Sequence, residues 1–215
     1  MDVACLFSGG KDSTLATFLM QSNGYNVKLV TFIPENRHSY MLHAENLHLC
    51  KLQAKAMNLK HFSFKVSGIK EKEVDEMLEH LKNIRNEFDA LCSGAFKSEY
   101  QKQRIDHIAD KLKVPSFCPL WKRSSLINAY KSMNIIITKV AAEGLTYDDL
   151  GKDFNDFLDS SRNLDIDKFF EGGEGETAVL DSIFFKKKIV IKKAKKIWHG
   201  TWGELVIEKA ALVEK

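Results

Sequence analysis

The chain has 215 residues, enough to bury one sizeable core or two small domains that share an interface, which excludes a peptide that folds only on a partner. Apolar residues make up 44% and charged residues 28%, so neither a disordered chain nor a fibrous repeat is indicated. A formal net charge of +3 is too small to indicate nucleic-acid binding by itself.

The first half of the sequence alternates short apolar runs with helical patterns. Repeated strand and helix units of this kind predict a parallel, twisted sheet with helices on both faces, which is an α/β fold. Strands are predicted at residues 3–7, 27–33, 61–66 and 89–92, and helices at 71–88 and 98–113.

The texture of the sequence changes around Pro115 and Pro119. We expect a domain boundary near residue 120, with a nucleotide-binding domain over 1–120 and a smaller α+β substrate-binding domain over 121–215. In this second part a helix is predicted at 123–133, a strand at 134–142, an acidic helix at 148–161 and a final hairpin with its turn at 199–203.

The cysteines and the N-terminus indicate a reducing compartment. No CxxC pair occurs, so neither a zinc knuckle nor a dithiol redox site is suggested, and the thiols are expected to be reduced and mostly buried. No apolar run approaches the ~18 residues that a membrane helix needs, and no basic leader is visible, so we expect a cytoplasmic protein without a membrane partner. The cysteines are Cys5, Cys50, Cys92 and Cys118.

The stretch "LFSGGKDSTLA", residues 6–16, is typical of a phosphate-binding loop. It follows the first predicted strand, and its glycines allow an anion to approach backbone N–H groups at the positive end of a helix dipole. It is not a Walker loop, because Cys5 stands where the first glycine should be and Asp12 where Ser or Thr should be. A plain glycine turn would need neither the lysine nor the hydroxyl groups.

Two later stretches also have compositions that are unusual for plain structure. Gly94 follows a strand and Ser98 precedes a helix, which predicts a second helix N-terminus at the carboxyl edge of the sheet, where ligands of α/β proteins bind. The stretch 169–191 places glycines and carboxylates between Phe169, Phe170, Phe184 and Phe185. Glycines alone would favour a solvated hairpin turn, but carboxylates beside apolar surface cost free energy unless they are paired or bind a cation.

"SGGKDS" resembles the pyrophosphate loop of the PP-loop ATPases, whose fold is of the adenine-nucleotide α-hydrolase type (HUP-like, Rossmann-like). Together with "SGAFKSEYQKQR", "PLWKR" and "EGGEGETAVLD", in this order, it is similar to the diphthine-ammonia ligase family. The resemblance implies a carbon–nitrogen ligase that uses ATP and ammonia to amidate the diphthine side chain of translation elongation factor 2. An acyl adenylate would form, and diphthamide, AMP and pyrophosphate would be the products.

The resemblance also implies residue roles. The phosphate loop would hold pyrophosphate, with Mg²⁺ expected and its ligands left open; a second group would line the nucleotide, and a third would bind the substrate. These groups are Ser8, Gly9, Gly10, Lys11, Asp12 and Ser13; then Gly94, Ser98, Tyr100, Gln101 and Arg104; then Trp121, Arg123, Glu171, Gly172, Gly173, Glu174, Glu176, Thr177 and Asp181. Lys11 and Asp12 are the catalytic residues that the resemblance implies, and Glu174 and Glu176 are expected to be catalytic on a separate hypothesis.

Glu174 and Glu176 carry a further hypothesis. Diphthine bears a trimethylammonium group and ammonia is mostly ammonium at neutral pH, so carboxylates beside aromatic rings suit both cations and could take a proton from the second. Free ammonia is the expected donor, because no glutaminase region is present. Phe170 stands where several relatives have glycine, and the lack of an appended second domain suits an archaeal version.

Two weaker patterns favour structural roles. His43, Glu45 and His48 do not have the H-E-x-x-H spacing, so a helix start with partly exposed histidines is favoured over a metal site. Seven lysines between residues 186 and 196 alternate with apolar residues, which favours a lysine-protected edge strand over a surface for an acidic partner or ribosomal RNA.

Two other functions stay open beside the ligase. One is a PP-loop ATPase that modifies tRNA bases, favoured by the loop and the lysines but weakened by the missing paired cysteines. The other is a nucleotide-binding protein without chemistry. A homo-oligomer is possible under each of them.

Overall fold

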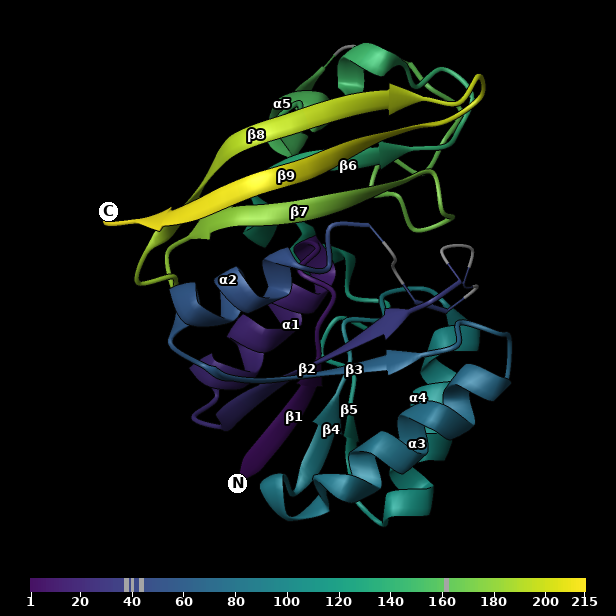
Figure 1. Cartoon of the computed structure of the whole chain (residues 1–215), viewed down its shortest axis with the longest axis vertical. Coiled ribbons are helices and arrows are strands. Elements are labelled where there is room, and N and C mark those ends of the chain that lie inside the picture. Colours follow the sequence, from purple (N-terminus) through teal and green to yellow (C-terminus); the bar gives the residue numbers. More distant parts are fainter. Residues whose placement is uncertain (37–38, 40, 43–44, 161–162) are drawn as a thin grey trace.

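The computed structural model describes residues 1–36, 39, 41–42, 45–160 and 163–215, and it contains two sheets (Figure 1). The first sheet is parallel, with strand order β3-β2-β1-β4-β5. Its strands are β1 (Asp2–Leu6), β2 (Asn26–Pro34), β3 (Lys60–Val66), β4 (Ala90–Cys92) and β5 (Ser116–Phe117). Its helices are α1 (Lys11–Ser22), α2 (Leu49–Met57), α3 (Lys72–Asn83) and α4 (Glu99–Leu112).

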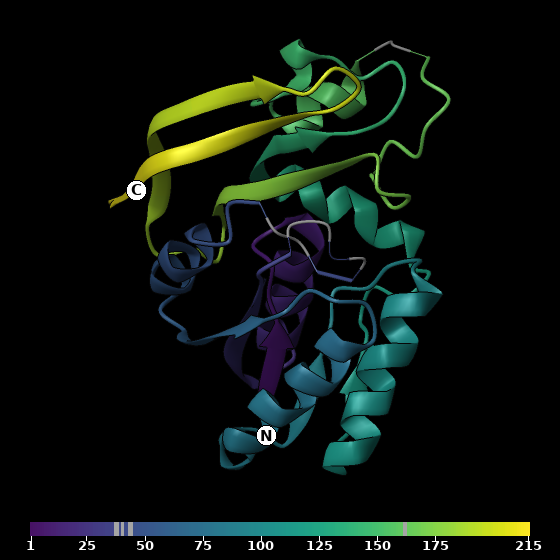
Figure 2. The same ribbon diagram turned by 45° about the vertical axis from the view of Figure 1, so that its right-hand side comes forward.

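Helices cover both faces of this sheet, and the residues of its central strand are therefore buried on both sides. Val3 and Cys5 of β1 pack in the core that contains α1 and α2, whereas Ala4 between them packs in the core of α3 and α4. Figure 2 shows α3 and α4 lying side by side. The predicted parallel sheet flanked by helices is confirmed.

The second sheet is antiparallel, with strand order β7-β6-β9-β8. β8 lies at its edge, and most lysine side chains of this strand are exposed, as expected for a lysine-protected edge strand. The strands are β6 (Met133–Val140), β7 (Gly175–Ser182), β8 (Lys188–Trp198) and β9 (Gly203–Val213), and one short helix, α5 (Phe154–Asp159), packs beside them.

Three predicted helices are shorter or of another type. The segment predicted at 123–133 is a 3₁₀ helix, Ser124–Ser132. The long helix predicted at 71–88 ends as α3 at Asn83, and a 3₁₀ turn, Arg85–Glu87, follows. The acidic stretch 148–161 is divided by Gly151, whose φ is +77°, into a 3₁₀ turn at Tyr147–Asp149 and α5, which the Asp153 side chain caps.

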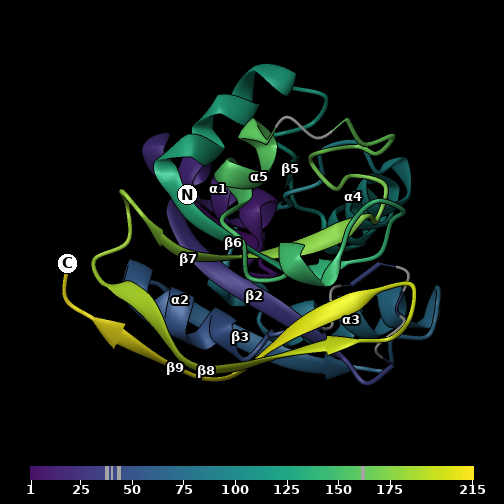
Figure 3. The same ribbon diagram turned by 90° about the horizontal axis from the view of Figure 1, so that it is seen from above.

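One apolar core joins the two sheets. Leu15 of α1 and Cys50 of α2 belong to the same buried cluster as Ile135 and Ile137 of β6. Figure 3 shows β8 and β9 passing over α2, which they contact. Buried Cys5, Cys50 and Cys92, together with half-buried Cys118, are free thiols, and burial raises the pKa of Cys50 to about 12. The shared core and the contacts of β8 and β9 with α2 show that the C-terminal sheet covers the helical face formed by α1 and α2. Its strand β7 also reaches the loop before α1.

Candidate active site

The loop between β1 and α1 is held by its own side chains. Gly9 adopts a φ of +78°, in the left-handed region that favours glycine. The Ser13 hydroxyl donates to the Gly10 carbonyl oxygen at 3.2 Å. The same Ser13 oxygen accepts the Ser8 N–H at 3.3 Å and lies 3.1 Å from the Ser8 hydroxyl. The first N–H groups of α1 have no acceptor inside the helix, so this fixed loop presents a site for an anion.

The C-terminal sheet is hydrogen-bonded to the same loop. The Lys11 N–H donates to the Thr177 hydroxyl at 3.2 Å, and the Val179 N–H donates to the Gly9 carbonyl at 3.0 Å. The buried Gln53 side chain donates to the carbonyls of both Gly9 (2.7 Å) and Val179 (2.9 Å). We call residues 171–177 the glycine-acid block; it runs into the start of β7. This block thus lies directly against the phosphate loop, although Lys11 and Thr177 are 166 residues apart in sequence.

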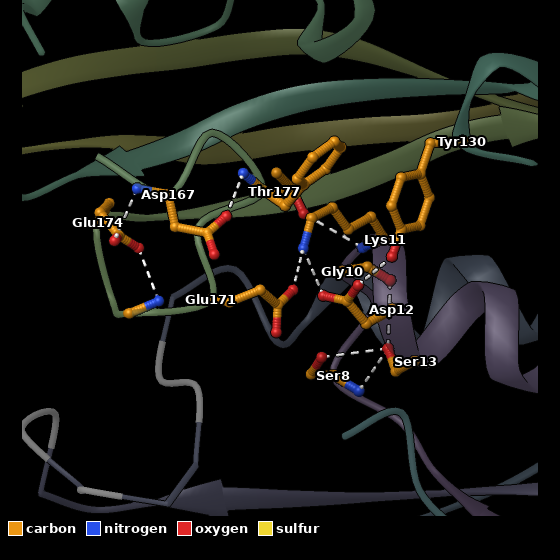
Figure 4. Close-up of polar contacts among 12 residues, drawn as sticks. Ser8, Gly10, Lys11, Asp12, Ser13, Tyr130, Asp167, Glu171, Glu174 and Thr177 are labelled. Carbon is orange, nitrogen blue, oxygen red and sulfur yellow. Dashed lines mark hydrogen bonds and ion pairs between the residues drawn. The ribbon is translucent and has the colours of Figure 1, made fainter. Parts of the chain in front are cut away.

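Lys11 is the centre of a buried group of charges (Figure 4). Its ammonium lies 2.6 Å from Asp12 Oδ2 and 3.2 Å from Glu171 Oε1, and the residue is 3% exposed. The Tyr130 hydroxyl donates to the other Asp12 oxygen at 2.5 Å. Lys11 Nζ also lies 5.9 Å from the centre of the Phe154 ring. The phosphate loop, the acidic residue Glu171 and two aromatic residues of the C-terminal part, Tyr130 and Phe154, therefore surround Lys11.

The electrostatic effects within this group oppose one another. Burial acts to lower the pKa of Lys11, but Asp12 and then Glu171 raise it above its usual value, so Lys11 remains charged. Burial and the Asp12 charge raise the pKa of Glu171 to about 7, against the effect of Lys11. Burial, and then Asp12, also raise the pKa of Tyr130. Glu171 consequently changes charge near neutral pH beside the loop that would hold phosphate.

A cavity of about 690 Å³ opens in front of the loop, within the size range of small-molecule sites. It brings together predicted residues from three parts of the chain. The predicted residues that line it are Ser8, Gly10, Lys11, Asp12, Ser13, Gly94, Ser98, Gln101, Glu171, Gly172, Gly173, Glu176 and Thr177. A Cβ on Gly94 would lie 2.7 Å from the Ser13 nitrogen, so only glycine allows the end of β4 to approach α1 this closely.

Other predicted site residues lie outside the lining of this cavity. Tyr100 and Arg104 both bond Glu71 on the surface beside α4. Asp181 is at the far end of β7, 2.7 Å from Lys215. Trp121 lies between Lys102 and Lys122, and the exposed Arg123 precedes the 3₁₀ helix that follows.

The glycine-acid block differs in detail from its prediction. The Glu174 carboxylate accepts the N–H groups of Asp167 and Gly172 and so stabilises the turn. Phe184 stacks on Phe18 of α1 at the other end of β7, with ring centres 4.4 Å apart, so it does not flank the carboxylates. Phe170 has a φ of +62°, the backbone conformation that glycine favours.

Sequence reasoning missed Gln53, Tyr130 and Lys139. Gln53 interrupts a mostly apolar helical face, which is the signal that could have identified it, whereas nothing local marks the other two. His43 lies outside the described residues, and His48 is exposed at the start of α2. Among the residues that the structure describes, no three His, Cys, Asp or Glu side chains converge as metal ligands would. In the same residues no helix is long and apolar enough to cross a membrane.

Fold and site together define an α/β protein in which an acidic segment lies against a glycine loop at a cavity, and comparisons with known proteins make the class specific. Residues 1–116 match the model of the diphthamide synthase N-terminal domain, and residues 119–213 match that of the diphthamide synthase C-terminal domain. The chain therefore belongs to the diphthamide synthase family, as the resemblance implied.

Several curated relatives bear the name diphthine-ammonia ligase. The protein of Bos taurus is 32% identical and that of Rattus norvegicus 31%, each over 93% of this chain and 86% of the relative. The protein of Schizosaccharomyces pombe is 29% identical over 95% of this chain, which spans only 38% of that longer relative. A crystal structure of a predicted subunit of tRNA methyltransferase from Methanocaldococcus jannaschii covers 68% of this chain and 80% of its own, with 24% identity and a TM-score of 0.44.

Proposed function

We propose that this chain is an ATP-dependent diphthine-ammonia ligase that converts the diphthine side chain of translation elongation factor 2 to diphthamide. One observation carries the proposal beyond the family relationship: the hydroxyl of Thr177 and the backbone of Val179, in the glycine-acid block of the family resemblance, are hydrogen-bonded to the phosphate loop itself. A substrate carboxylate beside this block would meet the α-phosphate of ATP in the same cavity.

The reaction needs activation of a carboxylate, because an oxide is a poor leaving group. The diphthine carboxylate attacks the α-phosphorus of ATP, the bond to the pyrophosphate oxygen breaks, and an acyl adenylate forms. Ammonia then attacks the acyl carbon and AMP leaves with the former carboxylate oxygen. Both halves of this sequence release anions, which positive groups must stabilise.

The phosphate loop supplies those groups. The fixed N–H groups at the start of α1 and the buried, charged Lys11 would hold pyrophosphate as it departs. Asp12 and Glu171 present the carboxylate oxygens that Mg²⁺ prefers, so they fit a magnesium ion bound together with ATP. Such an ion would neutralise phosphate charge.

The test measures AMP and pyrophosphate release from ATP with ammonium present. Diphthine-bearing elongation factor 2, bulk tRNA and no acceptor are compared, and amidation of the factor is followed by mass spectrometry. We expect release only with the factor, and a loss of at least about 100-fold for Lys11→Ala, since one preorganised charge contributes on this order. Lys82→Ala, which removes an exposed lysine of α3 outside the cavity, is the matched control and should retain full activity. Release of AMP and pyrophosphate with tRNA alone would contradict the proposal and identify a tRNA-modifying ATPase. Release in none of the samples would favour a protein that binds a nucleotide without chemistry.

A further inference from the structure

A second cavity, of about 900 Å³, adjoins the first at Lys139, which lines both. Its walls are the turn between β8 and β9, the segment after β6, and Glu45 before α2. The residues of its lining that lie at Lys139 are aromatic or acidic, and they are Trp202, Glu45 and Glu204. The cavity thus leads from the edge of the C-terminal sheet to the wall of the proposed active site.

Lys139 is surrounded by carboxylates from three segments. On the sheet it stands between its register partners Glu176 of β7 and Glu204 of β9. Its Nζ lies 3.2 Å from Glu45 Oε1 and 3.6 Å from Glu176 Oε1, and 5.6 Å from the centre of the Trp202 ring. This position therefore already accommodates one ammonium group, held by carboxylates and an indole face.

Several charged groups gather around Lys139 in the part of the chain that the structure describes. Glu45 and Glu176 lie near its Nζ, Glu204 is its register partner on β9, and His199, which stacks on Trp202, lies 3.3 Å from Glu204. Burial, and then the neighbouring Glu176, raise the pKa of Glu45 against the effect of Lys139, so this carboxylate takes up a proton more readily than an exposed glutamate does. Burial acts to lower the pKa of Lys139, but Glu176 and Glu45 raise it, so the lysine keeps its own proton.

One atom of this group lacks a partner. Glu45 Oε2 is buried, with its side chain 4% exposed, and among the described residues it meets no hydrogen-bond donor. A buried carboxylate oxygen without a donor is costly, and the cost disappears when a cation or a proton binds. Glu45 lines the second cavity while Oε2 itself is buried, so a donor from that side reaches this oxygen when the side chain turns toward the cavity.

We propose that the second cavity is the ammonium site of the ligase, in which Glu45 binds ammonium through its unpartnered oxygen and ammonia passes Lys139 into the first cavity. The inference rests on the proposed function. Ammonium gives one proton to the Glu45 carboxylate, which becomes a carboxylic acid. The resulting ammonia then leaves Glu45. The nitrogen lone pair then forms the bond to the acyl carbon as AMP departs, and a second proton is lost from the new amide. Glu45 returns its own proton to solvent through the second cavity.

The proposal separates two nucleophiles that differ in charge. Ammonium must lose a proton before it reacts, whereas hydroxylamine is mostly neutral at pH 7 and reacts without that step. In Glu45→Gln we therefore expect the KM for ammonium to rise at least tenfold and hydroxamate formation with hydroxylamine to stay within twofold of wild type. Pyrophosphate exchange into ATP, measured with the factor but without ammonium, should stay unchanged because adenylation precedes the amine. The matched control is Glu143→Gln, which changes an exposed glutamate of the same cavity.

A direct binding measurement makes the test independent of turnover. Ammonium chloride should raise the melting temperature of the wild-type protein and of Glu143→Gln more than sodium or tetramethylammonium chloride at equal ionic strength, and Glu45→Gln should lose this difference. If the wild type shows no pyrophosphate exchange, the proposed function fails, and the melting experiment still decides whether the cavity binds ammonium.

Three results would overturn the inference. They are an unchanged KM for ammonium in Glu45→Gln, an equal loss with hydroxylamine and ammonium, and no ammonium-specific stabilisation of the wild type. Should Glu45→Gln fold poorly, Trp202→Leu keeps the carboxylate and removes the indole face over Lys139, and it is expected to raise the KM for ammonium severalfold while pyrophosphate exchange persists.

Discussion

Glu171 couples the charge state of the site to the stability of the protein. Its pKa is raised from 4.5 to about 7 in the folded state, so between these values the folded protein binds more protons than the unfolded chain. The stability of the wild type therefore falls as the pH rises through this window. Glutamine carries no such proton, and the free energy of unfolding of Glu171→Gln relative to wild type should rise by roughly 2–3 kcal/mol between pH 5 and pH 8.

Urea unfolding at several pH values, with EDTA and without nucleotide, measures this change. Glu76→Gln is the matched control, because the Ser67 N–H lowers the pKa of Glu76 and the carboxylate is mostly ionised in both states from pH 5 upward, which leaves a change of only about 0.2 kcal/mol. Its difference from wild type should stay nearly constant from pH 5 to pH 8. A constant difference for Glu171→Gln as well would show that Glu171 does not titrate in this range.

At the same scale, individual residues separate what the sequence could predict from what it could not. Lys11 and Asp12 could be placed on the loop because strand, glycines and helix follow one another without interruption. Tyr130 could not be placed at Asp12, since 118 residues separate the two and only the packing of the second sheet joins them. Lys139 has an equally unremarkable sequence context, and its importance comes from neighbours on two other strands.

The loop between β1 and α1 depends on two properties of glycine at Gly9, its backbone freedom and its lack of a side chain. Gly9 and Gly24 have nearly the same φ, +78° and +80°, but a Cβ on Gly9 would lie 2.2 Å from Gln53 Oε1, whereas a Cβ on Gly24 would meet nothing within 4 Å. Both alanine variants should lose about 1 kcal/mol from backbone strain. Only Gly9→Ala should also displace Gln53 and the loop, and weaken ATP binding at least tenfold.

Calorimetric titration with ATP and urea unfolding of the two variants test this prediction. Gly24→Ala should retain the affinity of the wild type for ATP, because it keeps the strain and omits the contact. Equal ATP affinities for both variants would mean that the loop tolerates the displacement of Gln53.

Whole elements followed from sequence where hydrophobic periodicity controls them. The strands β1 to β4 and the helix α4 were predicted because buried strands and amphipathic helices leave a regular pattern. The strand β5 was not predicted, because two residues are too few to show a pattern. The helix predicted at 123–133 is a 3₁₀ helix at Ser124–Ser132, and its apolar spacing could not give the type because it fits both over so short a segment. The acidic stretch was predicted as one helix from its composition, whereas the positive φ of Gly151 and the cap at Asp153 divide it.

At the scale of the whole molecule, the shared core predicts a single unfolding transition. Far-ultraviolet circular dichroism reports mostly on α1–α4, while two of the three tryptophans, Trp198 and Trp202, report on the β8–β9 hairpin. Since one apolar cluster contains side chains from both sheets, thermal curves from the two probes should coincide within about 1–2 °C. Two separated transitions would show that the sheets unfold independently.

The hydrogen bonds of Gly9 have a thermodynamic consequence. Its carbonyl oxygen accepts from Gln53 of α2 and from Val179 of β7, so the backbone that would meet pyrophosphate is continuous with the strand that carries the acidic block. Two ligands that share such a support are linked reciprocally: whatever factor ATP adds to the affinity for the acceptor protein, the acceptor must add to the affinity for ATP. If ATP strengthens the binding of the acceptor protein in this way, release of pyrophosphate weakens the binding of the protein substrate. The peptide group of Gly9 would then help to set the order in which the products leave.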